Sequence, residues 1–301
     1  MRPREVNLLG VAAGLGAATP GAQDGPATLR RLGLIADLTR AGHRVEDLGD
    51  VPGVEETDPH APNAFVRRLP NILQVNRHTH DALVGTRRQR PDAFILIVGG
   101  DHSLAMGALG GLADTSRRLG LVWLDAHGDY NTPISSPSGN AHGMSLAVAC
   151  GRGHVDLRSV ADREPMVAES DVYLFGVRDL DSAEKVALYR SRVHLYDMHT
   201  WRAAGVPAAV VAAVRELAAR CDHVHLSFDI DVLAPQYVPG TGTPVAGGLT
   251  PAEAFDVLRA LSAQDLIGSA EYVEYNPHLD DEAQTTGALV RTLIAALMQT
   301  P

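Results

Sequence analysis

Residues 93–103 read AFILIVGGDHS, and this stretch decides the class of fold. A short apolar run, Ala93 to Val98, leads into two glycines, an aspartate and a histidine. Residues 121–129, LVWLDAHGD, repeat the arrangement. Short, almost continuously apolar strands are typical of a parallel sheet that is buried on both faces. We therefore expect an α/β fold with helices on both sides of the sheet.

Outward from these two strands, strand and helix patterns alternate along the chain, as right-handed β-α-β crossovers require. Further strands are expected at Glu5–Ala12, Arg44–Leu48, Val172–Gly176, Val193–Tyr196, His223–Phe228 and Leu266–Val273. Helices are expected from Pro26 through Leu38 with an end at Gly42, at Asn63–Arg90 with a bend at Pro70, and at Ser182–Arg190, Val206–Arg220, Pro251–Leu261 and Asp281–Met298. Asp50–Pro62 is expected to be a loop, and residues 1–301 a single domain.

Composition excludes several classes of protein. The 301 residues carry 26 basic and 36 acidic side chains, a formal charge of −10, and only Lys185 is a lysine, so no basic surface for nucleic acid is expected. No apolar run reaches the roughly 20 residues of a membrane span. Two cysteines, Cys150 and Cys221, do not make a disulfide framework, which favours a reducing cytoplasm.

Four apolar strands end in acidic or imidazole side chains, in GGDHS (99–103), DAHGD (125–129), SFDID (227–231) and EYVE (271–274). The carboxyl ends of parallel strands meet at one edge of a sheet, so these clusters are expected to converge there. Asp125, His127 and Asp129 are spaced two apart, as are Asp229 and Asp231. In extended backbone that spacing places side chains on one side, about 6.5–7 Å apart.

Such a set of ligands predicts a pair of divalent cations bridged by carboxylates. Oxygen and imidazole ligands without thiolate suit Mn²⁺ better than structural Zn²⁺. The alternative is that the aspartates only cap helices and turns, as they commonly do after strands. Three convergent clusters argue against it, because buried aspartates without cations would repel one another.

The strings GGDHS (99–103), DAHGDYNTP (125–133), SGNAHG (138–143) and SFDIDVLAPQYVPGTGTP (227–244) resemble the ureohydrolase family, and within it the arginases. The resemblance runs through most of the chain. It implies a three-layer αβα domain around an eight-stranded, mostly parallel sheet. It also implies hydrolysis of L-arginine to L-ornithine and urea by a hydroxide that bridges two Mn²⁺ ions.

Residue roles follow from the same resemblance. One ion is expected at His102, Asp125, Asp129 and Asp229, and the other at Asp125, His127, Asp229 and Asp231, with Asp125 and Asp229 bridging. His142, Glu274 and Asp129 are the expected catalytic groups: His142 transfers a proton, and Glu274 pairs with the guanidinium beside Thr243. Asn131 and Ser138 are expected to bind the α-carboxylate of the substrate, with support from Asn140. Asp181, with Glu184 nearby, is expected to bind the α-amine of the substrate.

The chain departs from the family at two positions: Ala234 stands where an aspartate is usual, and Ser145 where a proline is frequent. Neither is an expected metal ligand. Agmatine, guanidinobutyrate and formiminoglutamate stay open as alternative substrates, as do a binding protein without turnover and a deacetylase-like enzyme with one metal. The resemblance further suggests a homotrimer or homohexamer, without a motif that decides between them.

Overall fold

The computed structural model describes residues 4–54 and 65–299 and contains an eight-stranded sheet. The strands are β1 (Glu5–Val11), β2 (Arg44–Asp50), β3 (Phe94–Gly99), β4 (Leu119–Leu124), β5 (Val172–Val177), β6 (His194–Asp197), β7 (His223–Asp229) and β8 (Ser269–Val273). Their order is β2-β1-β3-β8-β7-β4-β5-β6, and every pairing is parallel. The expected fold class is confirmed.

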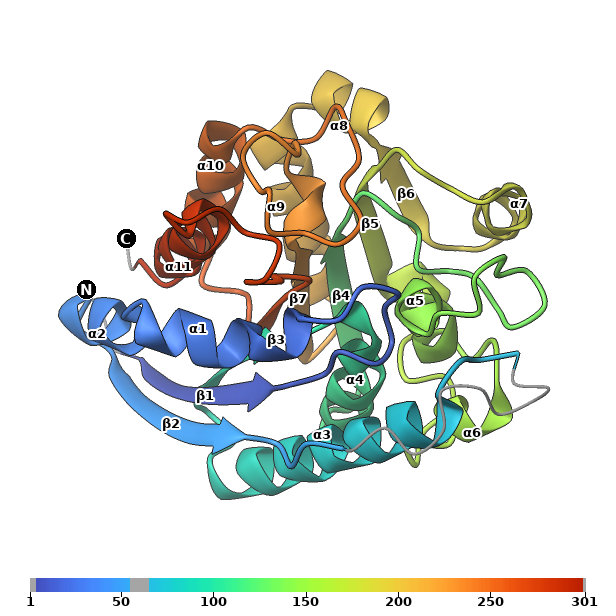
Figure 1. Ribbon diagram of the computed structural model, residues 1–301, viewed down its shortest axis with the longest axis horizontal. Coiled ribbons are helices and arrows are strands. Elements are labelled where there is room, and N and C mark those ends of the chain that lie inside the picture. The colour runs from blue at the N-terminus through green and yellow to red at the C-terminus, as the bar shows by residue number, and fades with distance from the viewer. Residues whose placement is uncertain (1–3, 55–64, 300–301) are drawn as a thin grey trace.

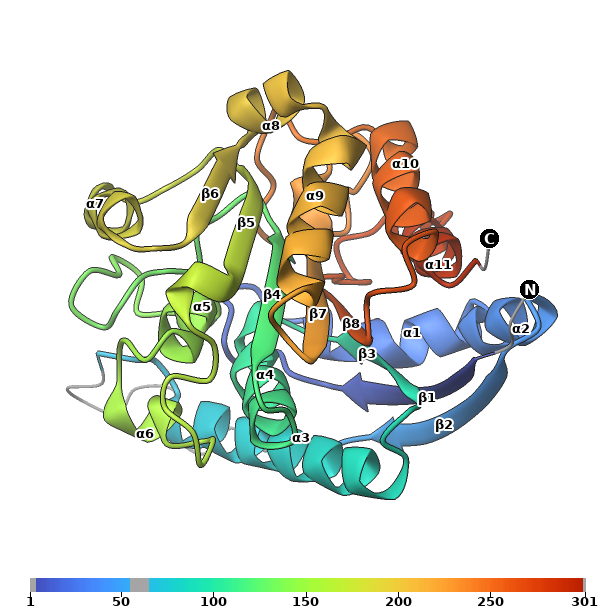
Figure 2. The ribbon, with the colours of Figure 1, turned by 180° about the vertical axis from the view of Figure 1, so that it is seen from behind.

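Helices cover both faces of this sheet (Figures 1 and 2). They are α1 (Gly25–Arg31), α2 (Leu34–Arg40), α3 (Leu69–Gln89), α4 (Ala105–Asp114), α5 (Ser145–Ala149), α6 (Val155–Arg158), α7 (Ser182–Arg190), α8 (Met198–Ala204), α9 (Val206–Ala218), α10 (Pro251–Ser262) and α11 (Thr285–Leu297). None of the helices in the described residues is long and apolar enough to cross a membrane.

Alternate side chains of each central strand enter two separate hydrophobic cores. In β3, Phe94, Leu96 and Val98 face the core formed with α1, α2 and α8–α11, while Ile95 and Ile97 face the core formed with α3–α6. Period-two alternation with both faces apolar is what a buried parallel strand requires. The two cores thus hold the middle of the sheet rigid from both sides.

Several predicted elements differ from the structure, among them the last helix, which begins at Thr285 rather than at Asp281. The helix expected through Leu38 is two helices, because the chain turns at Gly33, whose φ of 96° only glycine adopts without strain. Pro70 does not bend α3; it stands in the first turn of that helix, where its missing N–H costs nothing. The last strand begins at Ser269 rather than Leu266.

Four helices of the described residues were not predicted from the sequence. Helix α4 was not predicted because it is buried on every side and so has no polar stripe to show a helical period. The short helices α5, α6 and α8 were missed as well. Part of the expected loop Asp50–Pro62 and the start of the helix expected at Asn63 lie outside the described residues, and residues 65–68 are not helical.

Close packing of the backbone prepares the carboxyl edge of the sheet for a site. A Cβ on Gly100 would lie 1.6 Å from the carbonyl oxygen of Ala13, so only glycine fits where β3 leaves the sheet. The Gly100 N–H donates to Val11, and its carbonyl accepts from the N–H of Glu274, which follows β8. The ends of β1, β3 and β8 are therefore joined before any functional side chain is placed.

Candidate active site

Four neighbouring strands deliver the acidic and imidazole side chains to one place. In the sheet order, β3, β8, β7 and β4 are consecutive. His102 follows β3, Glu274 follows β8, Asp229 ends β7, and Asp125 follows β4. The convergence expected from the sequence is therefore present, and it follows from strand order alone.

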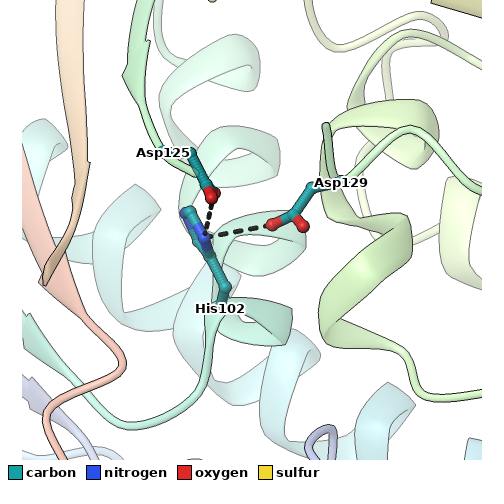
Figure 3. Close-up of side chains that lie close together, drawn as sticks. All are labelled: His102, Asp125 and Asp129. Carbon is teal, nitrogen blue, oxygen red and sulfur yellow. Dashed lines mark ion pairs between the residues drawn. The ribbon is translucent and has the colours of Figure 1, made fainter. Parts of the chain in front are cut away.

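The first cluster surrounds His102. Its Nδ1 lies 3.2 Å from Asp125 Oδ2, 3.1 Å from Asp129 Oδ2 and 3.1 Å from Asp229 Oδ2. Figure 3 shows His102 pointing at Asp125 and Asp129 from a different part of the chain. All four side chains are buried. One imidazole nitrogen among three carboxylate oxygens is an arrangement that can hold a divalent cation.

The second cluster lies beside the first and shares Asp125 with it. His127 Nδ1 is 2.9 Å from Asp231 Oδ2 and 3.5 Å from Asp125 Oδ1. Ligand atoms of these three residues also lie close enough together to hold one ion. Asp125 presents one oxygen to each cluster. The structure thus brings together all six expected metal ligands.

Local backbone, however, differs from the expected extended chain. β4 ends at Leu124, so Asp125, His127 and Asp129 lie in a loop, and Asp231 lies in a 3₁₀ turn, residues 230–232. Asp129 has a φ of 47°, a left-handed conformation that costs energy for a residue with a side chain. The alternation argument was wrong for this loop, and the left-handed turn brings Asp129 back toward His102.

Hydrogen bonds from neighbouring groups orient the carboxylates. Trp123 Nε1 donates to Asp125 Oδ2 at 2.9 Å, and the Trp123 ring stacks on His102 with 4.1 Å between centroids. The backbone N–H of Ala126 donates to Asp231 Oδ1 at 3.0 Å, and that of Asp231 to Asp229 Oδ1 at 2.8 Å. Hydrogen bonds within the protein therefore orient the oxygens of these expected ligands.

The electrostatics of the two clusters fit a cation. Burial and the neighbouring charges of Asp231 and Asp125 raise the pKa of Asp229 well above its ordinary value. Burial and the charge of Asp125 raise the pKa of Asp129 to about 6. For His102, burial disfavours the charged form, but the surrounding carboxylates outweigh it and raise the pKa. These carboxylates repel one another without positive charge between them.

Glu274 and His142 form a pair at the side of the clusters. Glu274 Oε1 accepts from the backbone N–H of His102 at 2.8 Å and lies 3.0 Å from His142 Nδ1. Burial opposes protonation of His142, but the Glu274 carboxylate outweighs it and raises the pKa of His142 to about 9. His142 is therefore a cation at neutral pH. Glu274, with a φ of 66°, is a second strained residue at this site.

A cavity of about 140 Å³ opens beside the two clusters. Its lining includes five of the six side chains expected to bind substrate, namely Asn131, Ser138, Asp181, Glu184 and Thr243. Asn131 Nδ2 donates to Asp181 Oδ2 at 2.9 Å, and Thr243 Oγ1 donates to Asp231 Oδ2 at 3.1 Å. Glu274 lines a smaller neighbouring cavity, which shares His142 and Thr243 with the first.

Two expected residues have different surroundings from the rest. Asn140 is buried, and it is not part of the cavity lining; its backbone N–H donates to Ser138 Oγ at 3.2 Å. Glu184 accepts from the N–H groups of Tyr130 and Asp181, in a capping box at the start of α7. Burial first, and the charge of Asp129, raise the pKa of Glu184 to about 7. Its contacts hold the two loops that border the cavity.

Sequence reasoning missed three residues of the lining, Ser136, Gly143 and Asp179. Each stands within two residues of a position that was singled out, so proximity in the motif was the available signal. The departures also have a place in the structure. Ser145 Oγ donates to the carbonyl oxygen of His102 at 2.9 Å. Ala234 is buried in the loop after β7, where Arg178 contacts the neighbouring carbonyl oxygens.

Comparisons with known proteins agree with this geometry. The family model described as the arginase family matches residues 4–299. The arginase of Bacillus caldovelox is 40% identical over 291 residues, which cover 96% of each chain, and that of Bacillus subtilis is 37% identical over 98% of each.

Solved structures give the same answer. The Bacillus caldovelox arginase superposes with a TM-score of 0.93, at 38% identity and 99% coverage of both chains. The Entamoeba histolytica arginase, solved in complex with L-ornithine, has a TM-score of 0.89 at 29% identity, again over 99% of both chains. The family model and the curated relatives each cover nearly the whole chain. The chain therefore belongs to the arginase family and is an enzyme, a hydrolase of the ureohydrolase type.

Proposed function

We propose that this enzyme hydrolyses L-arginine to L-ornithine and urea at a centre of two Mn²⁺ ions. One observation carries the proposal: two imidazole–carboxylate clusters share Asp125 and border a cavity lined by Asn131 and Asp181. The relatives at 33–40% identity are arginases, and the Entamoeba structure holds L-ornithine. The whole chain, residues 1–301, is proposed to act as one catalytic domain.

His102, Asp125, Asp129 and Asp229 are proposed to hold the first ion, and Asp125, His127, Asp229 and Asp231 the second. Oxygen and imidazole ligands without thiolate favour Mn²⁺ over structural Zn²⁺. When bound, the two ions supply a water activated to hydroxide near neutral pH and charge to stabilise the transition state. The protein's part is to keep both ion sites adjacent, which Asp125 does by facing each cluster with one oxygen.

Glu274 is proposed to pair with the substrate guanidinium. A carboxylate matches this planar cation in charge and geometry. Both contacts described above use Oε1, so Oε2 is the oxygen we assign to the substrate. Thr243 lines the same small cavity and is already oriented by its bond to Asp231. The guanidinium carbon is thereby held next to the clusters.

His142 is proposed to deliver the proton that the leaving ornithine amine needs. It borders both cavities, and its raised pKa keeps it protonated at neutral pH. Glu274 therefore has two tasks, because the same carboxylate that pairs with the guanidinium also keeps His142 charged. Loss of Glu274 would remove both.

The other end of the cavity is proposed to bind the amino-acid part of the substrate. Asn131 and Ser138 offer donors to the α-carboxylate, and Asp181 offers a carboxylate to the α-amine. Asn140 is proposed to support Ser138 through its backbone, and Glu184 to hold Asp181. A homotrimer or homohexamer in the cytoplasm is the proposed state of the enzyme.

Urea release tests the proposal directly. The Mn²⁺-loaded enzyme should release urea from arginine in strong preference to agmatine and guanidinobutyrate, because only arginine offers both groups that Asn131 and Asp181 bind. The metal-stripped enzyme should be inactive. Preference for agmatine would keep the centre and overturn the substrate. Inactivity on all three substrates would favour formiminoglutamate as the substrate or a protein without turnover. A content of one metal per chain, together with activity on acyl-lysine, would favour a deacetylase-like enzyme.

Removal of the metal should destabilise the protein more at pH 7.5 than at pH 5.5. Burial raises the pKa of Asp129 in the metal-free fold to about 6, so that fold loses stability as the pH rises from about 4 to about 6 and carries the full cost of a buried charge at pH 7.5. Each ion at 100 times its Kd adds about 3 kcal/mol to the free energy of unfolding. Thermal melts with Mn²⁺ and with EDTA at the two pH values measure the difference. An equal loss at both would contradict the assignment of Asp129.

Asp129→Asn should lower kcat by at least about 100-fold and reduce the affinity for one ion, since it removes one charged ligand while asparagine tolerates the left-handed backbone. The fold should be kept, as judged by circular dichroism. Metal analysis after dialysis, together with urea release, checks both effects. Near-normal turnover with two ions retained would remove Asp129 from the centre.

Asn131→Asp should lower kcat/KM for arginine by roughly 30- to 150-fold, equivalent to about 2–3 kcal/mol, because a carboxylate would replace a donor facing the α-carboxylate. The same change at Asn140, which is buried outside the cavity lining, is the matched control and should have a smaller effect on KM. Initial rates on arginine and agmatine separate the two contributions. Equal losses on both substrates would contradict the assigned role of Asn131.

A further inference from the structure

A chain of buried polar side chains runs along β7 and β8 behind the metal clusters. His223, His225 and Ser227 are spaced two apart on β7, and the register pairs His225 with Ser269 and Ser227 with Glu271 on β8. All five are buried, and Glu271 is fully so. The reaction proposed above uses none of them. Buried polar groups in the middle of an apolar sheet contribute little to stability, so their presence here suggests another role.

Contacts join these side chains into one line from the far end of the sheet to His102. Arg87 on α3 lies with a terminal nitrogen 3.1 Å from His223 Nδ1, and His223 Nε2 is 2.7 Å from Ser269 Oγ. Ser269 Oγ is 2.8 Å from His225 Nδ1. His225 Nε2 then faces Glu271 Oε2 at 3.6 Å, a distance beyond the normal hydrogen-bond range, and neither of these two buried atoms has a hydrogen-bond partner.

The line reaches the metal cluster through Ser227. Ser227 Oγ donates to Glu271 Oε1 at 2.7 Å. Having used its one hydrogen there, the same oxygen accepts from His102 Nε2, 2.8 Å away. His102 therefore carries its hydrogen on Nε2, and Nδ1 is the nitrogen that faces Asp125, Asp129 and Asp229. A metal-binding imidazole needs this tautomer.

Arg87 determines which atoms donate hydrogen in the contacts from Arg87 to His225, because a guanidinium only donates. His223 Nδ1 must accept from it, so His223 Nε2 donates to Ser269. Ser269 in turn passes its single hydrogen to His225 Nδ1, which leaves the His225 hydrogen on Nε2, pointing at Glu271. Burial, and then the charge of Arg87, lower the pKa of His223 to about 3, in agreement with a neutral ring.

Glu271 is the point where the two halves meet. Its carboxylate is fully buried and takes hydrogens from Ser227 on one side and faces the His225 N–H on the other. Burial disfavours its charge, but His225, His102 and Ser227 outweigh that cost and lower its pKa. A carboxylate behind a metal-binding imidazole makes that imidazole a stronger and better oriented ligand.

We propose that Glu271 and His225 are positioning residues which, through Ser227, hold His102 with Nδ1 toward the first ion and raise the affinity of that site for its cation. Arg87, His223 and Ser269 orient His225 for this purpose. The inference rests on the two-ion centre proposed above. It concerns only the His102 cluster, since His127 has no contact with this line of side chains among the interactions described.

The test uses binding of Mn²⁺ to metal-stripped protein, followed by electron paramagnetic resonance. Glu271→Gln should lower the affinity for one of the two Mn²⁺ ions by about 10- to 100-fold and leave the affinity for the other within about threefold of the wild-type value. His225→Gln should act in the same direction with a smaller change. Turnover by both variants at limiting Mn²⁺ should fall and recover when Mn²⁺ is raised, while KM for arginine stays unchanged.

A buried histidine elsewhere provides the matched control. His43 bonds through Nε2 to the carbonyl oxygen of Met298 at 2.6 Å, remote in sequence from the clusters. His43→Gln removes a buried ring of the same kind and should leave both Mn²⁺ affinities unchanged. Ser269→Ala is a milder second variant, in case Glu271→Gln does not fold. It removes the contact to His225 Nδ1 and leaves the His225 ring free to turn. It should lower the affinity for the same single ion by about threefold to tenfold.

Different failures point to different proposals. If the wild-type chain binds fewer than two ions, the two-ion centre is wrong. If it binds two, and Glu271→Gln, His225→Gln and Ser269→Ala bind both as tightly as the wild type, the positioning role is wrong and the centre stands. Equal weakening of both ions would also overturn the inference, because a general loss of structure rather than the orientation of His102 would then be responsible.

Discussion

Mutual repulsion among buried carboxylates is the constraint on which the rest of the structure depends. Asp125, Asp129, Asp229 and Asp231 lie together with little access to water, where each unneutralised charge is costly. Two imidazoles and the hydrogen bonds described above relieve only part of that cost. The fold must therefore be rigid enough to hold these groups together and must leave room for positive charge between them.

The sheet supplies that rigidity through its order rather than through any single strong contact. Because β3, β8, β7 and β4 are neighbours, residues more than 100 positions apart in the chain leave the sheet side by side. Two apolar cores pack against the two faces of the sheet, and Gly100 allows the ends of β1, β3 and β8 to approach one another closely. Strain at Asp129 and Glu274 is tolerated because this framework is stiff.

The sequence predicted the layers, the strands and the convergence of the ligands, because apolar runs and the residues after them are local features. It failed where tertiary packing decides. Gly33 divides one apparent helix into two, and α4 has no helical period because it is buried all round. The loop around Asp129 is turned, not extended, so the geometric reason that led to these candidate ligands was partly wrong.

The line of buried polar side chains behind His102 could not be predicted from the sequence, for a different reason. His223 and His225 are buried in β7, and each lies within hydrogen-bond distance of Ser269. What no spacing could reveal is their cross-strand register, since Ser269 and Glu271 lie more than 40 residues further along the chain. None of these side chains alone indicates a role, and only the pairing of β7 with β8 brings them together behind His102.

Ala234, where the resemblance to arginases predicts an aspartate, lies in the loop after β7. Arg178 donates to the carbonyl oxygens of Asp231, Leu233, Val245 and Ala246, so the loop after β7 is held without a carboxylate at position 234. Burial lowers the pKa of Arg178, and the charges of Asp231, Asp125 and Asp229 act against that shift. The Arg178 guanidinium thus places a positive charge near Asp125, Asp229 and Asp231 while it holds the loop. The same side chain therefore contributes both to the structure of this loop and to the charge balance of the two clusters.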